Sequence, residues 1–150
     1  MYEMNTINIY QIFTRLFANQ NETNKEFGTL EENGCSKFND ITATALEELK
    51  KFGITHVWYT GVIRHASCTD YSKYGLSLDN PRVVKGRAGS PYAIKDYFDV
   101  DPDLAVNVKN RMKEFEDLLD RTHNAGLKCI MDFVPNHVSR EYKSSLLEKY

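Results

Sequence analysis

Three polar side chains follow one apolar segment near the end of the chain. Residues 127–131 are typical of a buried strand, and Asp132, Asn136 and His137 come soon after them. In parallel α/β folds, the carboxyl ends of the strands carry the chemistry. A carboxylate, an amide and an imidazole at such an edge can bind hydroxyl groups. The same residues also fit a plain strand end, in which Pro135 ends the strand pairing and His137 is solvated.

A metal site is the other chemistry that this segment suggests. Asp132 and Asn136 would suit calcium, a hard ion that prefers oxygen ligands. Zinc needs at least three nitrogen, sulfur or oxygen ligands, and only Asp132 and His137 are evident candidates here. The cysteines are Cys35, Cys68 and Cys129, and their spacing is not that of a zinc site.

Two further segments combine aromatic rings with polar groups. Residues 89–102 contain Tyr92, the pair Asp96 and Tyr97 four and five residues later, and then Val-Asp-Pro. An aromatic ring can bury the flat C–H face of a sugar while nearby polar groups bind its hydroxyls. An aromatic-rich loop that only packs over a sheet is the alternative. Residues 9–17 read Ile-Tyr-Gln-Ile-Phe-Thr-Arg-Leu-Phe, a composition typical of a strand.

Two units of helix, glycine and strand must position these segments. The first unit has Asp40 as the predicted N-cap, an apolar face of helical spacing over residues 41–52, and Gly53 as the left-handed cap before a strand at 54–60. In the second unit, Gly126 separates a helix from the third strand. The apolar face of that helix consists of Val108, Met112, Phe115 and Leu119.

The repeated pattern predicts an α/β fold with a parallel sheet. Connections between parallel strands are right-handed, and near-continuous apolar strands are typical of a sheet that is buried on both faces. We therefore expect three parallel strands with flanking helices on one side. The strands are predicted near residues 7–16, 54–60 and 128–134, and the helices near 41–52 and 108–125.

A long segment, about residues 61–107, follows the second predicted strand and contains several glycines and prolines. It is expected to be irregular, and loops of this length inside compact domains are uncommon and usually functional. The segment leaves the sheet at the same end as Asp132 and His137. Tyr92 is therefore expected within reach of His137.

Taken together, the three segments resemble the α-amylase family of glycoside hydrolases, known as glycoside hydrolase family 13. Residues 132–137 match its first signature segment, which has an Asp, a small apolar residue two positions on, and Asn-His four and five positions on. Tyr92 and the Asp-Tyr pair after it match a loop of the family, although residues 90–91 are Ser-Pro where His-Gly is usual. Residues 9–17 resemble the first barrel strand.

The resemblance implies a (β/α)8 TIM barrel. Residues 1–150 would be the N-terminal segment of its catalytic domain, and the barrel is incomplete because a whole one needs about 250 residues. The resemblance implies that His137 hydrogen-bonds the sugar at the cleavage subsite, that Asp132 orders neighbouring groups, and that Tyr92 stacks on the sugar. It also implies Asn136 as a calcium ligand in relatives that bind the ion, with the other ligands in a domain inserted after strand three. No cofactor is required, and calcium is expected only in the full-length parent.

The catalytic carboxylates of the family are not expected in this chain. Retaining hydrolysis needs two carboxylates about 5 Å apart, and in the family these follow strands four and five. Asp99, Asp101 and Asp103 form an acidic cluster before the second helix and are not assigned catalytic roles. The sequence therefore predicts the N-terminal fragment of an α-glucan-active glycosidase, retaining in the full-length parent and inactive alone. Two alternatives stay open: a non-catalytic barrel relative that serves as a binding or structural protein, and a complete small flavodoxin-like domain.

Composition limits the partners. The formal net charge of −2 gives no basic field for nucleic acid or a membrane surface, and no apolar run approaches the roughly 20 residues of a membrane helix. The first five residues do not read as a signal peptide, and the cysteines are odd in number, so a cytoplasmic location is expected unless a signal has been trimmed. The expected partners are an α-glucan or maltooligosaccharide in the parent, and further copies of the chain through open sheet edges.

Overall fold

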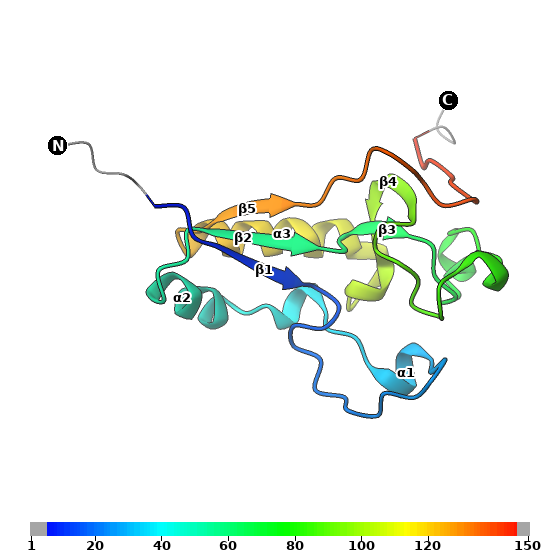
Figure 1. The fold of residues 1–150 in the computed structure, drawn as a ribbon, viewed down its shortest axis with the longest axis horizontal. Coiled ribbons are helices and arrows are strands. Elements are labelled where there is room, and N and C mark those ends of the chain that lie inside the picture. The colour runs from blue at the N-terminus through cyan, green and yellow to red at the C-terminus, as the bar shows by residue number, and fades with distance from the viewer. Residues whose placement is uncertain (1–5, 147–150) are drawn as a thin grey trace.

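A computed structural model describes residues 6–146, and its centre is a three-stranded parallel sheet (Figure 1). The strands lie in the order β1 (Ile9–Phe13), β2 (His56–Thr60) and β5 (Lys128–Met131), so the predicted parallel arrangement is confirmed. β1 and β5 are shorter than the predicted 7–16 and 128–134. β1 ends early because the amides of Leu16 and Phe17 both bond back to the carbonyl of Phe13 and form a turn. The prediction that residues 1–5 do not form a signal peptide concerns residues outside the described part of the chain.

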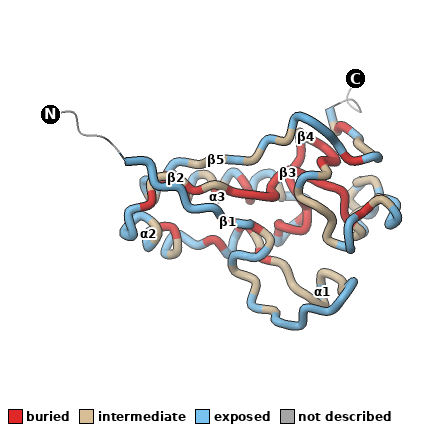
Figure 2. The backbone as a smooth tube through the Cα atoms, in the orientation of Figure 1, coloured by how far each residue is buried: buried red, intermediate tan, exposed pale blue. Residues whose placement is uncertain are grey.

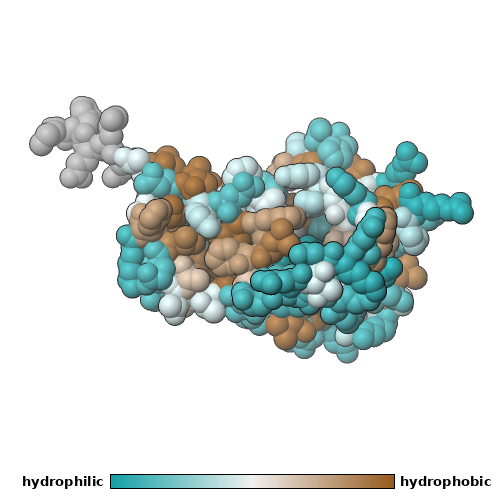
Figure 3. All heavy atoms as spheres, turned by 60° about the horizontal axis from the view of Figure 1, so that its bottom comes forward, coloured by the Kyte–Doolittle hydropathy of each residue, from teal (hydrophilic) through white to brown (hydrophobic). Residues whose placement is uncertain are grey.

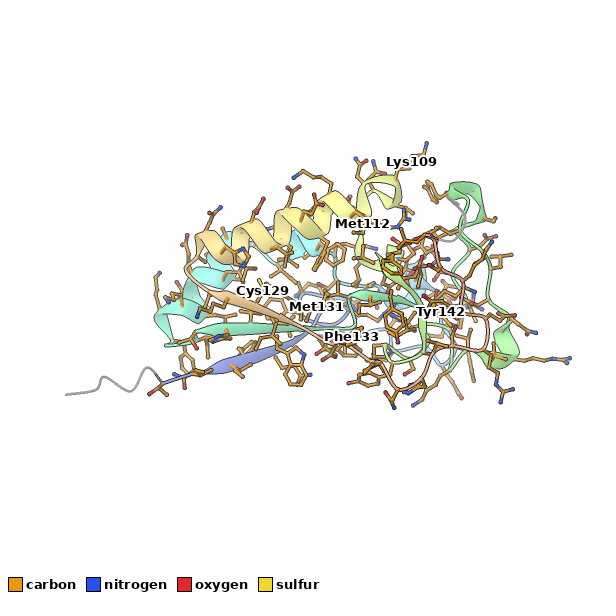
Figure 4. All side chains as sticks on the ribbon, turned by 90° about the horizontal axis from the view of Figure 1, so that it is seen from above. Lys109, Met112, Cys129, Met131, Phe133 and Tyr142 are labelled. Atoms are coloured by element: carbon orange, nitrogen blue, oxygen red, sulfur yellow. The ribbon has the colours of Figure 1, made fainter. Side chains whose placement is uncertain are left out.

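Two long helices, α2 (Ala43–Lys51) and α3 (Arg111–Asn124), cover one face of this sheet, as predicted (Figure 4). Asp40 is not the cap of α2, which is a correction. The Thr42 hydroxyl accepts from the amide of Ala45 at 3.2 Å, whereas the Asp40 carboxylate bonds to the amide of Lys37. The hydroxyl one residue before the helix is the better placed acceptor for its free N–H groups.

One residue predicted for the buried face of α3 is exposed, and one that was not predicted is buried. Met112 is 43% exposed, whereas Leu118 is fully buried among the core residues. A 3-10 turn at Val108–Asn110 precedes α3. Because a 3-10 turn has fewer residues per turn than an α-helix, it shifts the phase of the apolar face between Val108 and the helix proper. Gly53 after α2 adopts the predicted left-handed conformation, with a φ of 94°, and Gly126 after α3 also has a positive φ, of 75°.

The segment after β2 is irregular only in part, which corrects the expectation for residues 61–107: it contains two strands. β3 (Ile63–His65) and β4 (Ile94–Val100) pair antiparallel as a second sheet, with two irregularities in the register. This small sheet lies beyond the carboxyl ends of β1 and β2 (Figure 1). The remaining short elements are α1 (Leu30–Asn33) and 3-10 helices at Phe38–Asp40, Ser72–Tyr74, Pro81–Val83 and Pro102–Leu104.

The two faces of the parallel sheet differ in burial. Ile12 and Tyr59 are neighbours in the register, point to the helices and are almost fully buried. Residues of the opposite phase form an open face, on which Ile9 and Phe13 are exposed, and β1 is largely exposed in Figure 2. Hydrophobic side chains also reach the molecular surface near the N-terminal end and along the middle of the molecule in Figure 3. Within residues 6–146, no helix is both long enough and apolar enough to span a bilayer.

Candidate functional site

A groove of about 830 Å³ lies at the carboxyl ends of β1 and β2, on the open face of the sheet. Gln11 and Phe13 of β1 and Thr60 of β2 form its sheet side, and the Gln11 amide donates to the Thr60 hydroxyl at 2.8 Å. Loop residues complete the lining, among them Phe27 after β1 and Tyr92 between β3 and β4. The groove therefore combines aromatic rings, including that of Tyr92, with polar groups.

Two glycines fix the loop that carries Tyr92. Gly89 has a φ of 80°, and a Cβ there would lie 1.8 Å from the carbonyl oxygen of Ala66. Gly61 has a φ of 79°, and a Cβ there would lie 3.1 Å from the ring of Phe13. Both positions need glycine, for its conformation and for the close approach. As a result the loop lies tightly against the end of β3, and Tyr92 is 47% exposed at the groove.

Asp132 follows β5 and contacts a side chain of the neighbouring strand. The indole Nε1–H of Trp58 donates to Oδ1 of Asp132 at 2.5 Å. Trp58 lies beside Ile130 in the register. Asp132 comes two residues after Ile130, so its side chain lies on the same open face as that of Trp58. The second oxygen, Oδ2, is buried and has no hydrogen-bond partner among residues 6–146. Such an acceptor is suited to a donor supplied from outside these residues.

His137 and Asn136 are exposed side chains in the segment after β5. The hydroxyl of Tyr97 donates to the carbonyls of Val134 and His137, the latter at 3.4 Å. The Tyr97 ring also packs on Phe133 and Tyr142, with centroids 5.6 and 5.9 Å apart, and Figure 4 shows the latter two. The structure thus ties this segment to β4. Asp132, Asn136 and His137 do not belong to the lining of the groove that contains Tyr92.

The described residues do not form a calcium site by themselves. Asn136 offers one exposed amide oxygen, whereas calcium takes six to eight oxygen ligands. In the part of the chain that the structure describes, no group of three His, Cys, Asp or Glu side chains is placed to hold a metal ion. Any calcium bound at Asn136 would need its remaining ligands from elsewhere.

A charged network at the ends of β1, β3 and β4 was not predicted. Arg15, after β1, pairs with the carboxylate of Asp103, which also accepts from the hydroxyl of Tyr71 at 2.7 Å. Oδ2 of Asp101 lies 3.7 Å from the guanidinium of Arg15 and 3.6 Å from Nε2 of His65. The network joins the ends of β1, β3 and β4. An Arg at the end of an apolar strand and closely spaced Asp residues were the signals in the sequence.

The two carboxyls of this network have pKa values that move apart. Burial raises the pKa of Asp101 above its ordinary value, and the nearby charge of Asp103 adds to this. Burial also acts to raise the pKa of Asp103, but Arg15 and the Tyr71 hydroxyl outweigh it and hold that pKa below the ordinary value. Arg15 and Tyr71 thus favour the ionised form of Asp103 in particular. Neither carboxyl has a place in the groove beside Tyr92.

Asp99, the first of the three acidic residues, is also paired. Its carboxylate accepts from the guanidinium of Arg111 at 2.6 and 3.0 Å, and Arg64 lies 3.6 Å away. All three carboxyls thus have a cationic side chain nearby.

Comparison with known proteins identifies the family. The family model for the α-amylase catalytic domain ("Alpha amylase, catalytic domain") matches residues 11–146, which include Tyr92 and the segment from Asp132 to His137. The chain belongs to the α-amylase family. Its parallel sheet and flanking helices are accordingly the first part of a (β/α)8 barrel. The flavodoxin-like alternative is excluded.

Several α-amylase-family proteins are similar to the chain over most of its length. An α-glucosidase of Pediococcus pentosaceus is 29% identical over 134 residues, which cover 89% of this chain and 18% of that protein. A cyclomaltodextrin glucanotransferase of Bacillus sp. (strain 1011) is 27% identical over 146 residues, covering 87% and 18%. The solved structure of a maltogenic α-amylase from Thermotoga neapolitana has a TM-score of 0.61 at 23% identity, covering 98% and 27%. The chain thus spans about a fifth of the length of the curated relatives it matches.

Proposed function

We propose that this chain is the N-terminal part of an α-amylase-family glycosidase that acts on α-glucans, with retaining hydrolysis of α-glycosidic bonds in the full-length parent. The observation that carries the proposal is the groove at the carboxyl ends of β1 and β2, where Tyr92 is exposed beside hydrogen-bonding side chains. The names of the similar α-glucosidase and glucanotransferase support the substrate class.

In this proposal three side chains support the sugar at the cleavage subsite. Tyr92 stacks on the ring, and His137, which is exposed, hydrogen-bonds a hydroxyl. Asp132, held by Trp58 through one oxygen, uses the other to order a donor from the rest of the barrel. The proposed reaction needs no cofactor. Calcium would bind at Asn136 only with further oxygen ligands from outside the chain.

The same proposal has the 150 residues inactive alone. Among the described residues, the groove has no Asp or Glu in its lining, and retaining hydrolysis needs two carboxylates about 5 Å apart. The carboxylates would come from later strands of the barrel. The proposal also keeps the cytoplasmic location expected from the sequence, with which the free thiols of Cys35, Cys68 and Cys129 agree.

The experiment compares Tyr92→Phe with Tyr92→Ala in the full-length protein, with kcat/KM on a maltooligosaccharide measured alongside Tm. Loss of substrate positioning can lower the rate by ~10²-fold. Stacking predicts that Phe keeps most of the activity and that Ala loses it at little cost in Tm. The purified 150-residue chain should not turn over a chromogenic maltoside. A folded Tyr92→Ala variant with unchanged kcat/KM, or turnover by the chain alone, would contradict the assignment.

A second candidate is a non-catalytic relative that keeps the barrel as a binding or structural protein. It is favoured by the similarity to an amino acid transporter heavy chain of Mus musculus, which is 30% identical over 135 residues, covering 89% of this chain and 14% of that protein. A full-length protein that is retarded by soluble starch in a native gel, yet turns over no α-glucan, would support this candidate against the first.

A further inference from the structure

Phe27 is an exposed aromatic residue in an unfavourable backbone conformation. Its φ is 52°, in the left-handed region that side chains other than glycine rarely adopt. Its side chain is 68% exposed, so packing against the core does not explain the choice of residue. Strained residues persist only where the surrounding structure holds them, and they gather at ligand sites.

The loop around Phe27 is built to hold this conformation. The side-chain amide of Asn33 accepts from the amide of Lys25 at 2.8 Å and donates to its carbonyl at 2.9 Å, while the amide of Gly28 bonds to the same carbonyl. A Cβ at Gly28 would lie 2.5 Å from Nδ2 of Asn33, so the turn closes tightly over that side chain. The Asn21 amide joins the loop to the carbonyl of Glu32. Phe27 is thus fixed in place by bonds that do not involve its ring.

The ring of Phe27 lines the same groove as Tyr92, although the two residues come from different loops. The groove volume of about 830 Å³ falls within the ~300–1,000 Å³ of pockets that take drug-sized ligands. Its polar side chains are mostly uncharged, with Lys85 as the one charged residue in the lining among those described. Exposed rings beside neutral hydrogen-bonding groups fit a neutral oligosaccharide, which presents flat C–H faces and hydroxyls.

We propose that Phe27 is a specificity-determining residue that stacks on a further glucose unit of an α-glucan, next to the unit at Tyr92. This inference rests on the proposed function, because it assumes that Tyr92 contacts the sugar. It extends the site to the loop after β1 and explains why that loop keeps a strained aromatic residue at the groove. Longer glucans should therefore gain affinity from Phe27, and substrates too short to reach it should not.

The test uses Phe27→Gly in the full-length protein. Glycine accepts a positive φ without strain, so Tm should stay the same or rise. Retardation by soluble starch in native gels should weaken, and kcat/KM on maltoheptaose should fall about tenfold, as expected for part of the burial of a Phe side chain, while kcat/KM on a short chromogenic maltoside stays unchanged. The matched control is Phe52→Ala, since Phe52 is 85% exposed at the end of α2 and does not line the groove.

Starch retardation and a maltoheptaose-to-maltoside activity ratio that are both unchanged in Phe27→Gly would overturn the inference. If Tyr92→Ala lowers activity in the same experiments, the proposed function stands and only the role of Phe27 fails. If the wild-type protein turns over no α-glucan, the gel still decides, because a stacking role requires that Phe27→Gly weaken the retardation. Absence of any retardation and turnover in the wild type would reject both proposals.

Discussion

At the scale of single residues, the contact between Trp58 and Asp132 determines how the carboxylate faces the open side of the sheet. Trp58→Phe keeps an aromatic ring and removes only the Nε1–H donor, which leaves the carboxylate without its observed partner. A buried polar group left unpaired costs about 1–3 kcal/mol. In the full-length protein we expect kcat/KM on a maltooligosaccharide to fall, by up to ~10²-fold if the carboxylate loses its position.

A double-mutant cycle separates this positioning role from a general loss of stability. If Trp58 acts through Asp132, the kinetic effect of Trp58→Phe should largely disappear in an Asp132→Asn background. Additive effects of the two substitutions on kcat/KM would mean that Trp58 acts by another route. Urea unfolding of the same variants measures how much of the fall in kcat/KM comes from a lower free energy of unfolding.

Residue type and spacing predicted part of the site, and tertiary structure decided the rest. Asp132 and Tyr92 could be found because a carboxylate after a buried strand and a Tyr before an Asp-Tyr pair are local patterns. Trp58 could not, because its contact with Asp132 depends on the register of β2 against β5. Phe27 could not, because its exposure and its positive φ follow from hydrogen bonds within its loop. The expected approach of Tyr92 to His137 stays a prediction.

At the scale of elements, Asp103 holds β1 and the region between β2 and β4 together. Asp103→Asn keeps the shape of the side chain but leaves the largely buried guanidinium of Arg15 without its closest counter-charge. Removing one partner of a buried ion pair typically costs about 3–5 kcal/mol, and Asp101 at 3.7 Å should keep the loss near the lower end. Asp117→Asn is the control, because its pair with Lys113 is exposed and should contribute less than about 1 kcal/mol.

The contribution of Asp103 should also depend on pH with a definite sign. Its pKa in the folded protein is lowered, so the stabilisation is fully present above the ordinary carboxyl pKa of about 3.9 and is lost as the pH falls through the lower folded value. The difference in unfolding free energy between wild type and Asp103→Asn should therefore be constant near neutral pH and shrink in acid. A difference that already declines between pH 8 and pH 6 would contradict the assigned ionisation.

Helical periodicity and glycine positions predicted the main elements, since these signals are local. The repeat of helix, glycine and strand placed α2, β2, α3 and β5 correctly to within a few residues. The pairing of β3 with β4 was missed, because the two strands are separated by a long segment and their register is irregular at Arg64. The apolar spacing also does not reveal the 3-10 turn before α3. For this reason Leu118 was missed as a buried residue and Met112 was wrongly expected to be one.

At the scale of the whole molecule, the parallel sheet has two edge strands in the part that the structure describes, β1 and β5. In the sheet order β1-β2-β5, each of them pairs on one side only, and the open face beside them carries exposed Ile9 and Phe13. Unpaired edges and exposed apolar side chains promote association of chains. The fold by itself thus favours contact with further strands, whether from the same protein or from another copy.

We therefore expect the isolated 150-residue chain to self-associate in a concentration-dependent manner, as measured by light scattering. Ile9→Lys should reduce this association, because a lysine on an exposed edge strand opposes strand addition. It should do so at little cost in Tm, since Ile9 is 51% exposed. Ile12→Lys is the contrasting variant: Ile12 is almost fully buried, so this substitution should unfold the chain. A strictly monomeric wild-type chain at all concentrations would show that β1 and β5 are protected, and an Ile9→Lys variant that associates like the wild type would place the contact elsewhere.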